Sequence, residues 1–456
     1  MNRVVLSRNR KKRLEQGHPW VYYSEIDRIE GEPAPGDLVE IVNDRGQYLA
    51  TGYYNPASKI TVRVVSYSPI EEMDQAFFAE RFRYCRAFRS RFLGEQDACR
   101  VVYGEADFLP GLVVDKFGDV LVVQILSLGM ERRREAIVGA LAEVFAPLGI
   151  YERSDVPVRE LEGLNQRKGP VYGECPRFVR VRENGLWIEV DIYEGQKTGY
   201  FLDQRENRAA VAPLMTGWGT RSGITMREVE GEDGSRKIVP VNKNGKEVQY
   251  PYWDGALVLD CFAHTGSFTL HACKYGAKKV TCLDISGHAI ETARRNVELN
   301  GFSDRVEFVV ADAFEYLREQ ARALEERKHR GLTHAGVKVD TSKALGGKGR
   351  TWDVIILDPP AFAKNRESVR NALRGYKDIN LHALKLINEG GFLVTASCSY
   401  HVRPDMFLRT VHEAAGDAGK LLRLVEYRGA GKDHPQILGV DEGNYLKFAI
   451  FEVTSR

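Results

Sequence analysis

The stretch that most constrains the fold is residues 256–268, which read ALVLDCFAHTGSF. Its first four residues form an apolar run that is long enough for a buried strand and too short for a helix. The run ends at Asp260, a turn follows, and Ser267 opens a helical pattern. A strand, an acid, a tight turn and a helix are typical of the first unit of an α/β sheet. In such sheets ligands bind outside the carboxyl ends of the strands.

The turn in this stretch argues against a dinucleotide. The dinucleotide fingerprint needs three glycines in the pattern G-x-G-x-x-G, and this turn has only Gly266. Asp260 would also repel a pyrophosphate. A carboxylate suits a ligand with a cationic or hydroxyl-rich end, and S-adenosylmethionine has both. On this stretch alone, an ordinary turn with a structural aspartate explains the pattern equally well.

Composition limits the class of protein. The chain has 456 residues, of which 43% are hydrophobic, so it has room for about two to four domains with ordinary cores. Its apolar runs fall short of the ~20 residues of a membrane span, and no signal-peptide core is present near its start. We therefore expect a cytoplasmic protein that does not associate with membranes. Seven cysteines without a C-x-x-C pair indicate neither a metal site nor a disulfide framework.

Positive charge is clustered although the formal net charge is only +2. Residues 1–13 contain several basic and no acidic side chains, and further arginines cluster in residues 81–91 and 132–134. Such clusters are typical of proteins that bind nucleic acids. For any one cluster alone, a solvated helix face is the commoner explanation.

The N-terminal part of the chain has two patterns. Residues 1–74 contain short β-rich runs separated by turn signals, which predicts a small β domain. We expect Trp20 in its core rather than on a base-stacking surface. Residues 75–195 combine strand-like runs with a helix expected at about 130–145, which predicts an α+β domain or, failing that, a plain spacer.

Residues 196–456 alternate strand and helix signals and predict an α/β domain. The expected strands are residues 256–260, 279–284, 306–311, 353–357, 391–396, 421–425 and 445–453. Ser286 is expected to cap the helix after the second of these strands. Two polar stretches, 216–254 and 328–350, interrupt the pattern and are expected to be loops or a small hairpin.

Acidic residues follow three successive strands. Asp260 ends the first, Asp284 ends the second, and Asp312 follows the third. An acid at about the spacing of Asp284 from the glycine turn binds ribose hydroxyls in nucleotide folds. Asp312 could reach an adenine amino group. Three acids at one edge of a sheet favour a ligand site over three unrelated structural residues.

The next two strand ends carry a rigid loop and a cysteine. Asp358-Pro359-Pro360-Ala361-Phe362 follows the fourth strand, and its two prolines restrict the backbone, so the loop could position a planar base. A strand end broken by prolines is the structural alternative, but it leaves Asp358 unexplained. Cys398 follows the fifth strand. Alone it would be a small core residue, but its place at the edge with Asp358 favours a nucleophile.

Short strings along the chain resemble known families. GHPWVY, PGDLVEI and NPASKITVRVVS resemble the PUA domain, a compact RNA-binding barrel, and GEADFLPGLVVDKFGDVLVVQ is similar to the linker domain beside PUA in one group of RNA methyltransferases. FLDQREN, LDCFAHTGSF, LDISGHAIETARRNVELNG, DVIILDPPAF and TASCSYH follow in the order seen in bacterial PUA-containing 23S ribosomal RNA cytosine-C5 methyltransferases. The resemblance covers nearly the whole chain.

This resemblance implies a Rossmann-like class I methyltransferase domain with a seven-stranded sheet, preceded by a PUA barrel and an α+β linker domain. It also implies S-adenosylmethionine as cofactor and large-subunit ribosomal RNA as partner. Cys398 would be the catalytic nucleophile, assisted by Asp358. The residues implied for the cofactor pocket are Gln204, Arg205, Asp260, Phe262, Thr265, Gly266, Asp284, Asp312 and Asp358. Those implied for the substrate base are Pro359, Pro360 and Phe362.

The chain departs from the family in its two insertions, which leave the RNA contacts open. In the wider RNA cytosine-C5 group a second cysteine often stands where this chain has Pro360, so the base for the last step must come from elsewhere. Two alternatives stay open: methylation of an exocyclic or ring nitrogen, and a non-enzymatic RNA-binding assembly factor with a vestigial fold. The oligomeric state is open too, a homodimer included.

Overall fold

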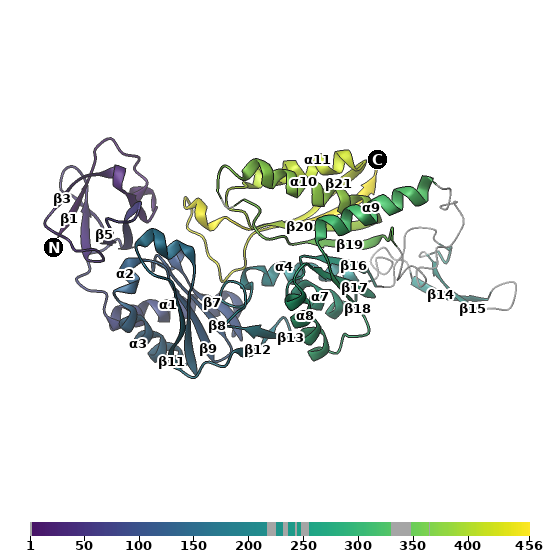
Figure 1. The fold of residues 1–456 in the computed structure, drawn as a ribbon, viewed down its shortest axis with the longest axis horizontal. Coiled ribbons are helices and arrows are strands. Elements are labelled where there is room, and N and C mark those ends of the chain that lie inside the picture. The colour runs from purple at the N-terminus through teal and green to yellow at the C-terminus, as the bar shows by residue number, and fades with distance from the viewer. Residues whose placement is uncertain are drawn as a thin grey trace. The chain divides into compact units, whose positions relative to one another are not determined.

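The computed structural model describes residues 2–216, 225–230, 236–241, 244–247, 255–329, 348–363 and 365–456 (Figure 1). The chain divides into two compact units. The first contains Met1–Arg205 and Gly431–Asn444, and the second contains Glu206–Ala430 and Tyr445–Arg456. The sequence pattern did not predict that residues 431–444, late in the chain, belong with its N-terminal part.

A six-stranded sheet opens the first unit, where a small β domain was expected. Its strand order is β2-β6-β5-β4-β1-β3. Trp20, expected in the core, is instead half-buried, and its indole Nε1 donates a hydrogen bond to Glu105 Oε1 at 2.8 Å. The strands are β1 (Arg3–Leu6), β2 (Trp20–Tyr22), β3 (Ile26–Glu30), β4 (Leu38–Val42), β5 (Tyr48–Tyr54) and β6 (Ile60–Ser66).

The same unit contains a second, five-stranded sheet with the order β11-β10-β9-β8-β7. The single helix expected at 130–145 is in fact two helices, because Arg133 between them has φ −112° and ψ 19°, outside the helical region. The elements are α1 (Gln75–Leu93), β7 (Ala98–Tyr103), β8 (Leu112–Phe117), β9 (Val120–Ile125), α2 (Leu128–Glu131), α3 (Arg134–Phe145), β10 (Gly149–Ser154) and β11 (Arg167–Gly173).

The two N-terminal sheets share a core. Tyr53 and Val65 from the first sheet belong to one buried cluster with Phe78 and Phe82 of α1. The hydroxyl of Tyr53 donates to the backbone oxygen of Pro110 at 2.7 Å. An antiparallel pair of strands, β12 (Phe178–Glu183) and β13 (Leu186–Asp191), follows and forms a separate two-stranded sheet.

The second unit is built on a seven-stranded sheet, which confirms the predicted α/β class. The strand order is β18-β17-β16-β19-β20-β22-β21. β22 runs opposite to the other six strands and so pairs antiparallel with both β20 and β21, as expected for the last strand pair. The strands are β16 (Leu257–Cys261), β17 (Lys279–Asp284), β18 (Val306–Val310), β19 (Trp352–Leu357), β20 (Ile387–Ser397), β21 (Lys420–Arg428) and β22 (Lys447–Ser455).

Helices flank this sheet, with α7 and α8 drawn on one side of the strands and α9, α10 and α11 on the other (Figure 1). The predicted cap is confirmed, since Ser286 Oγ accepts the Ala289 N–H at 3.2 Å. β20 begins before its expected start because Ile387 pairs with Trp352. The helices are α4 (Arg205–Ala210), α5 (Ala212–Met215), α7 (Ser267–Lys274), α8 (Gly287–Leu299), α9 (Ala313–His329), α10 (Val369–Leu386) and α11 (Pro404–Asp417).

The two insertions are described only in part. Within residues 216–254, β14 (Thr225–Glu230) and β15 (Arg236–Val241) form an antiparallel two-stranded sheet, which confirms the small hairpin. Most of the stretch expected at 328–350 lies outside the described residues. Among the helices that are described, none is long and apolar enough to cross a membrane.

Candidate active site

The sheet of the second unit brings five of the predicted catalytic and cofactor-binding residues to one edge. β16 pairs in parallel with β17 and β19, β17 with β18, and β19 with β20. The carboxyl ends of all five strands therefore lie on the same side. The residues at these ends are Asp260 in β16, Asp284 in β17, Asp312 after β18, Asp358 after β19 and Cys398 after β20.

Asp260 is the most deeply buried of these acids, with no solvent exposure. Its Oδ2 accepts a hydrogen bond from the Thr269 hydroxyl at 2.7 Å, whereas Oδ1 has no partner among the described residues. Burial, together with the negative charges of Asp358 and Asp284, raises the pKa of Asp260 to about 7. A buried carboxyl with an unsatisfied oxygen suits a ligand that brings a donor or a positive charge.

The turn after β16 is strained. Phe262 and His264 adopt positive φ angles of 63° and 49°, which non-glycine residues rarely do. A Cβ at Gly266, whose φ is 79°, would lie 3.0 Å from the Cβ of Ala293, so the turn admits no larger residue without adjustment. Thr265 Oγ1 is buried without a partner among the described residues.

Asp284 and Asp312 have structural contacts that the sequence did not predict. The carboxylate of Asp284 accepts the backbone N–H of His264 and of Ser286, each at 2.9 Å. Asp312 Oδ1 accepts the N–H of Glu315 at 3.0 Å and so caps α9. A carboxylate oxygen has two lone pairs, so both side chains retain acceptor capacity for a ligand.

Cys398 lies against the proline loop. Its Sγ donates to the backbone oxygen of Pro359 at 3.7 Å, and Cys398 is half-buried. The backbone N–H of Ala363 donates to Ser399 Oγ at 3.1 Å, which ties the two loops together a second time. Pro360 is exposed, and the ring of Phe362 packs at 4.6 Å from that of Tyr376.

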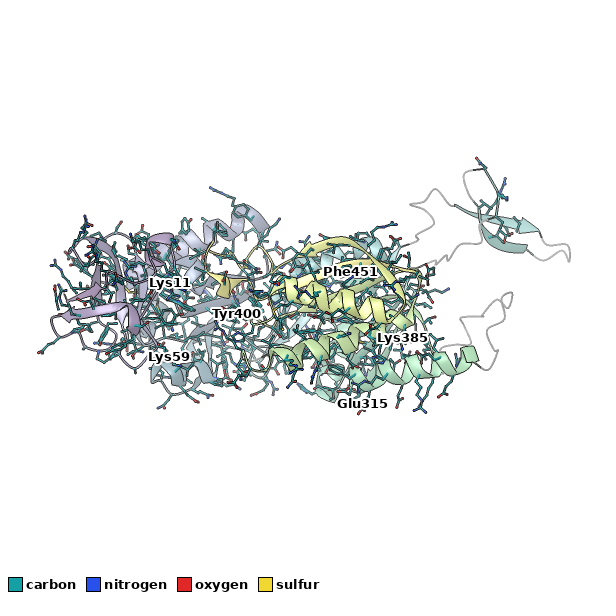
Figure 2. All side chains as sticks on the ribbon, turned by 90° about the horizontal axis from the view of Figure 1, so that it is seen from above. Lys11, Lys59, Glu315, Lys385, Tyr400 and Phe451 are labelled. Atoms are coloured by element: carbon teal, nitrogen blue, oxygen red, sulfur yellow. The ribbon has the colours of Figure 1, made fainter. Side chains whose placement is uncertain are left out.

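Two residues from other elements, Tyr376 and Lys447, support the loop that carries Cys398, and neither of them was predicted from the sequence. The hydroxyl of Tyr376 hydrogen-bonds to Ser397 Oγ and Ser399 Oγ, each at 2.9 Å. Lys447 Nζ donates to the backbone oxygen of Ser399 at 2.7 Å. The signal that could have revealed Lys447 is a charged residue at the head of an otherwise apolar strand, KFAIF. Tyr400, the next residue of the loop, is 40% exposed (Figure 2).

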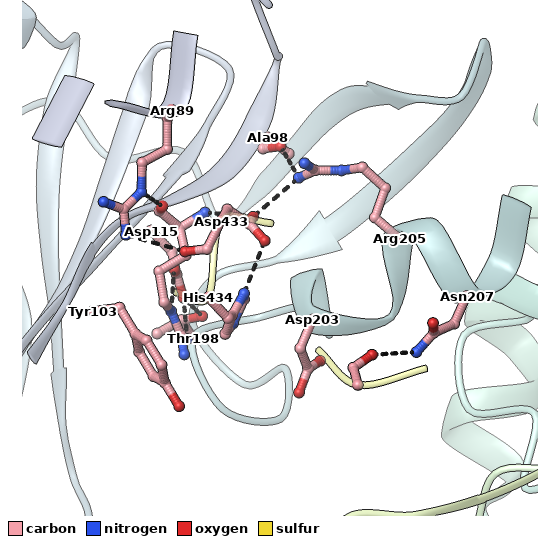
Figure 3. A network of polar contacts seen from close by, with 12 residues as sticks. Arg89, Ala98, Tyr103, Asp115, Thr198, Asp203, Arg205, Asn207, Asp433 and His434 are labelled. Atoms are coloured by element: carbon pink, nitrogen blue, oxygen red, sulfur yellow. Dashed lines mark hydrogen bonds and ion pairs between the residues drawn. The ribbon is translucent and has the colours of Figure 1, made fainter. Parts of the chain in front are cut away.

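Gln204 and Arg205 belong to the first unit. The guanidinium of Arg205 donates to the backbone oxygen of Ala98 and forms an ion pair with Asp433 at 3.3 Å (Figure 3). Arg205 thus helps to hold the segment 431–444 within the first unit, a role that the sequence did not predict. The assignment of both residues to a cofactor pocket stays a prediction.

The sheet edge fits S-adenosylmethionine and shows no metal site. The unsatisfied Asp260 Oδ1 and Thr265 Oγ1 are buried acceptors beside a turn that needs glycine. Such groups match a ligand with a cationic centre and hydroxyl donors. Among the described residues, no group of His, Cys, Asp and Glu side chains could hold a metal ion.

Known proteins match the chain over its full length. Residues 4–67 match a PUA-like domain family and residues 258–325 a methyltransferase domain family. "Ribosomal RNA large subunit methyltransferase I" of Escherichia coli K12 is 37% identical over 450 residues, which cover 98% of both chains. The protein of the same name from Escherichia coli O1:K1 / APEC shows the same identity and coverage.

Solved structures show the same fold at lower identity. A Streptococcus mutans protein described as a SAM-dependent methyltransferase matches with a TM-score of 0.71 and 20% identity, covering 99% of this chain and 100% of that one. A protein described as a methyltransferase complexed with SAH matches over the same shares with a TM-score of 0.73 and 20% identity. At this identity the two likenesses establish the fold, which is that of a methyltransferase.

Proposed function

The chain belongs to the ribosomal RNA large subunit methyltransferase I family, and from this premise we propose that it transfers a methyl group from S-adenosylmethionine to C5 of a cytosine in 23S ribosomal RNA. The observation that carries the choice of C5 is Cys398. Of the seven free cysteines only Cys398 and Cys175 are not buried, and of these two only Cys398 lies at the carboxyl ends of the strands. Methylation of an exocyclic amine needs no cysteine there.

The thiolate of Cys398 would overcome the low nucleophilicity of C5 in the substrate. C5 of cytosine is a poor carbon nucleophile. When the Cys398 thiolate adds to C6, an S–C6 bond forms and the C5–C6 double bond is broken. Its electrons shift towards C4 and N3, which makes C5 an enamine-type nucleophile. After C5 has gained its methyl group, a base removes the C5 proton, the double bond re-forms and Cys398 leaves as a thiolate. Asp358, near N3, would stabilise the charge that develops during the attack.

The cofactor would be held by the acids at the strand ends. Asp284 would accept the two ribose hydroxyls, Asp312 would face the adenine, and Asp260 with Thr265 would face the methionine part. When bound, S-adenosylmethionine supplies an electrophilic methyl group. The neighbouring turn of residues 262–266 would bring its backbone close to this ligand, since Gly266 carries no side chain.

The RNA base must leave its stack to reach Cys398. Pro359, Pro360 and Phe362 would receive the base, because the prolines hold the loop rigid and the ring of Phe362 is supported by Tyr376. Residues 1–74, which include the PUA-like match, would supply RNA affinity rather than chemistry. Their basic first residues would contact phosphates, and this contribution should weaken with added salt.

Replacement of Cys398 by alanine tests the proposal. Cys398→Ala should abolish methylation and leave S-adenosylmethionine affinity nearly unchanged in calorimetry, because the thiol contacts the base and not the cofactor. The matched control is Cys175→Ala, which removes the other half-buried cysteine and should retain activity. Target RNA with 5-fluorocytidine should trap a Cys398–RNA adduct that survives a denaturing gel, since fluorine cannot leave as a proton does.

The alternatives predict different results. An exocyclic amine attacks with its own lone pair, so an amine methyltransferase would tolerate Cys398→Ala and form no trapped species. Robust methylation by that variant would refute the C5 assignment. If the wild-type protein bound RNA without methylating it, a non-enzymatic assembly role would replace both chemistries.

A further inference from the structure

Lys447 is a buried cation with no acidic partner among the described residues. It is the first residue of β22 and pairs across the sheet with Ser397 of β20, the residue before Cys398. Its side chain has no solvent exposure, and its Nζ donates to the backbone oxygens of Ser399 and Tyr445, each at 2.7 Å. An ammonium group has three donors, so one remains without a partner in the described part of the chain.

Burying this charge lowers the stability of the folded protein, which suggests that the charge has a functional role. An unpaired ammonium in a protein interior loses its hydration without gaining an ion pair. Burial lowers the pKa of Lys447 to about 8, and among the described residues Cys398 is the titratable group that opposes this effect. At neutral pH the ammonium form therefore prevails, and within the described part of the chain the thiol of Cys398 is its potential counter-charge.

Lys447 also helps to fix the backbone that carries the cysteine. Ser399 is held at its carbonyl oxygen by Lys447 and at its hydroxyl by Tyr376 and by the N–H of Ala363. All these contacts converge on the residue that follows Cys398. They hold the thiol at the Pro359 carbonyl, where it donates a hydrogen bond in its protonated form.

We propose that Lys447 is a positioning residue for the nucleophile: its buried ammonium holds the Ser399 carbonyl and supplies the positive charge that favours the thiolate form of Cys398. This inference rests on the proposed function of Cys398. The ionisation breaks the S–H bond, leaves the electron pair on sulfur and releases the proton to water. The thiolate is the nucleophilic form of cysteine, so the ammonium raises the fraction of enzyme ready to attack C6.

Other titratable groups near Cys398 must be considered in a pH experiment. They include Tyr376 from α10, whose pKa is raised by burial and in part by a negative charge on Cys398. They also include Asp358 from the loop after β19, next to Pro359. Burial raises the pKa of Tyr376, so its hydroxyl stays neutral at neutral pH. Both groups are present in every variant below, and a difference between variants therefore reports Lys447.

The test is the alkylation of Cys398 by iodoacetamide in the full-length protein, followed by peptide mass spectrometry between pH 5 and 10. In Lys447→Met, which keeps the length of the side chain and removes its charge, the pH midpoint should rise by about one unit. The alkylation rate at pH 7 should fall roughly tenfold, since one unit is a tenfold change in thiolate. Lys447→Arg keeps the charge and should restore most of the wild-type profile.

Two controls separate charge from general damage. Lys385→Met removes a partly exposed lysine of α10 in the same unit (Figure 2) and should leave the Cys398 profile unchanged. Alkylation of Cys175, in the first unit, serves as an internal reference in every sample. A merely structural role of Lys447 would lower the rate at all pH values, or abolish S-adenosylmethionine binding, without moving the midpoint.

The outcomes decide the inference separately from the proposed function. An unchanged midpoint in Lys447→Met, with cofactor binding intact, would refute it. If that variant lost cofactor binding, Lys447→Gln would be measured under the same criterion, and a raised midpoint in a folded Lys447→Arg would also contradict the role of charge. Alkylation needs neither RNA nor turnover, so persistent methylation by Cys398→Ala would overturn the nucleophile while leaving this charge coupling measurable.

Discussion

Buried charged side chains in the two units differ in whether they have an oppositely charged partner. In the first unit, Arg100 and Asp115 form a buried pair with two hydrogen bonds of 2.8 Å each. Thr198 donates a third to the same carboxylate at 2.5 Å, and Asp115 and Thr198 are labelled in Figure 3. In the second unit, Asp260 and Lys447 are equally buried but form no ion pair within the described residues.

The pKa values of two buried aspartates, Asp433 in the first unit and Asp260 in the second, shift in opposite directions. Burial by itself would raise the pKa of Asp433 in the first unit, but the charges of His434 and Arg205 hold that pKa well below its usual value. Among the described residues, Asp260 in the second unit accepts its side-chain hydrogen bond from the neutral hydroxyl of Thr269, and burial raises its pKa to about 7. A buried pair is costly to break at one partner, whereas a buried charge without a counter-charge is typical of a functional site.

The largest effect is expected when a paired charge loses its partner. Arg100→Met leaves the Asp115 carboxylate buried without its arginine and should lower the free energy of unfolding by about 3–5 kcal/mol. Urea titration measures this loss. The double variant Arg100→Met/Asp115→Leu removes both charges and should recover much of it. An exposed pair, Arg83 with Glu143, is the control, and Arg83→Met should change stability by less than about 1 kcal/mol. Equal losses at both pairs would erase the contrast.

A smaller effect of opposite sign is expected at the unpaired acid. Asp260 has a folded-state pKa of about 7, above its ordinary value of 3.8. Between these values the folded state holds a proton that the unfolded state has lost, so wild-type stability falls as pH rises. Asp260→Asn cannot titrate and should gain stability relative to wild type by roughly 1–3 kcal/mol between pH 5 and 7. Urea titrations at pH 5, 6 and 7 without cofactor measure the difference.

The matched control for this slope is Asp304→Asn, which changes an exposed acid of the same unit. Its difference from wild type over the same pH range is the reference against which the slope of Asp260→Asn is compared. A flat profile for Asp260→Asn relative to this reference would mean that Asp260 is solvated in solution, and the comparison between the two units would then lose its clearest member.

The smallest effect is expected from a change in residues 216–254, which contain neither the buried ion pair nor the buried charges without a counter-charge. Residues 216–254 are polar, and β14 pairs with β15 in a two-stranded sheet of its own. Replacing this stretch by a short Gly/Ser linker should change the free energy of unfolding by about 1 kcal/mol or less. The methylation rate should stay within a few-fold of wild type. A large drop in rate would show that the stretch belongs to the RNA site or to a lid over the cofactor.

Local sequence patterns determined the strand ends and what stands on them. β17 covers Lys279–Asp284 as predicted, and Ser286 caps the next helix. These features depend on an apolar run, a polar residue and a cap within a few positions of one another. The parallel order of the sheet then follows from the alternation of strands and helices, so Asp260, Asp284 and Cys398 could be placed at one edge from the sequence alone.

Only the tertiary structure decided which distant side chains meet. Lys447 and Ser399 lie 48 residues apart, and Arg205 and Asp433 lie 228 apart. Nothing in the local pattern fixes these contacts, because β22 inserts antiparallel between β20 and β21, and residues 431–444 join the other unit. Whether a buried charge finds a partner depends on such long-range packing. The sequence by itself therefore determined the acids and the cysteine, and the tertiary structure decided which charges were left without a counter-charge.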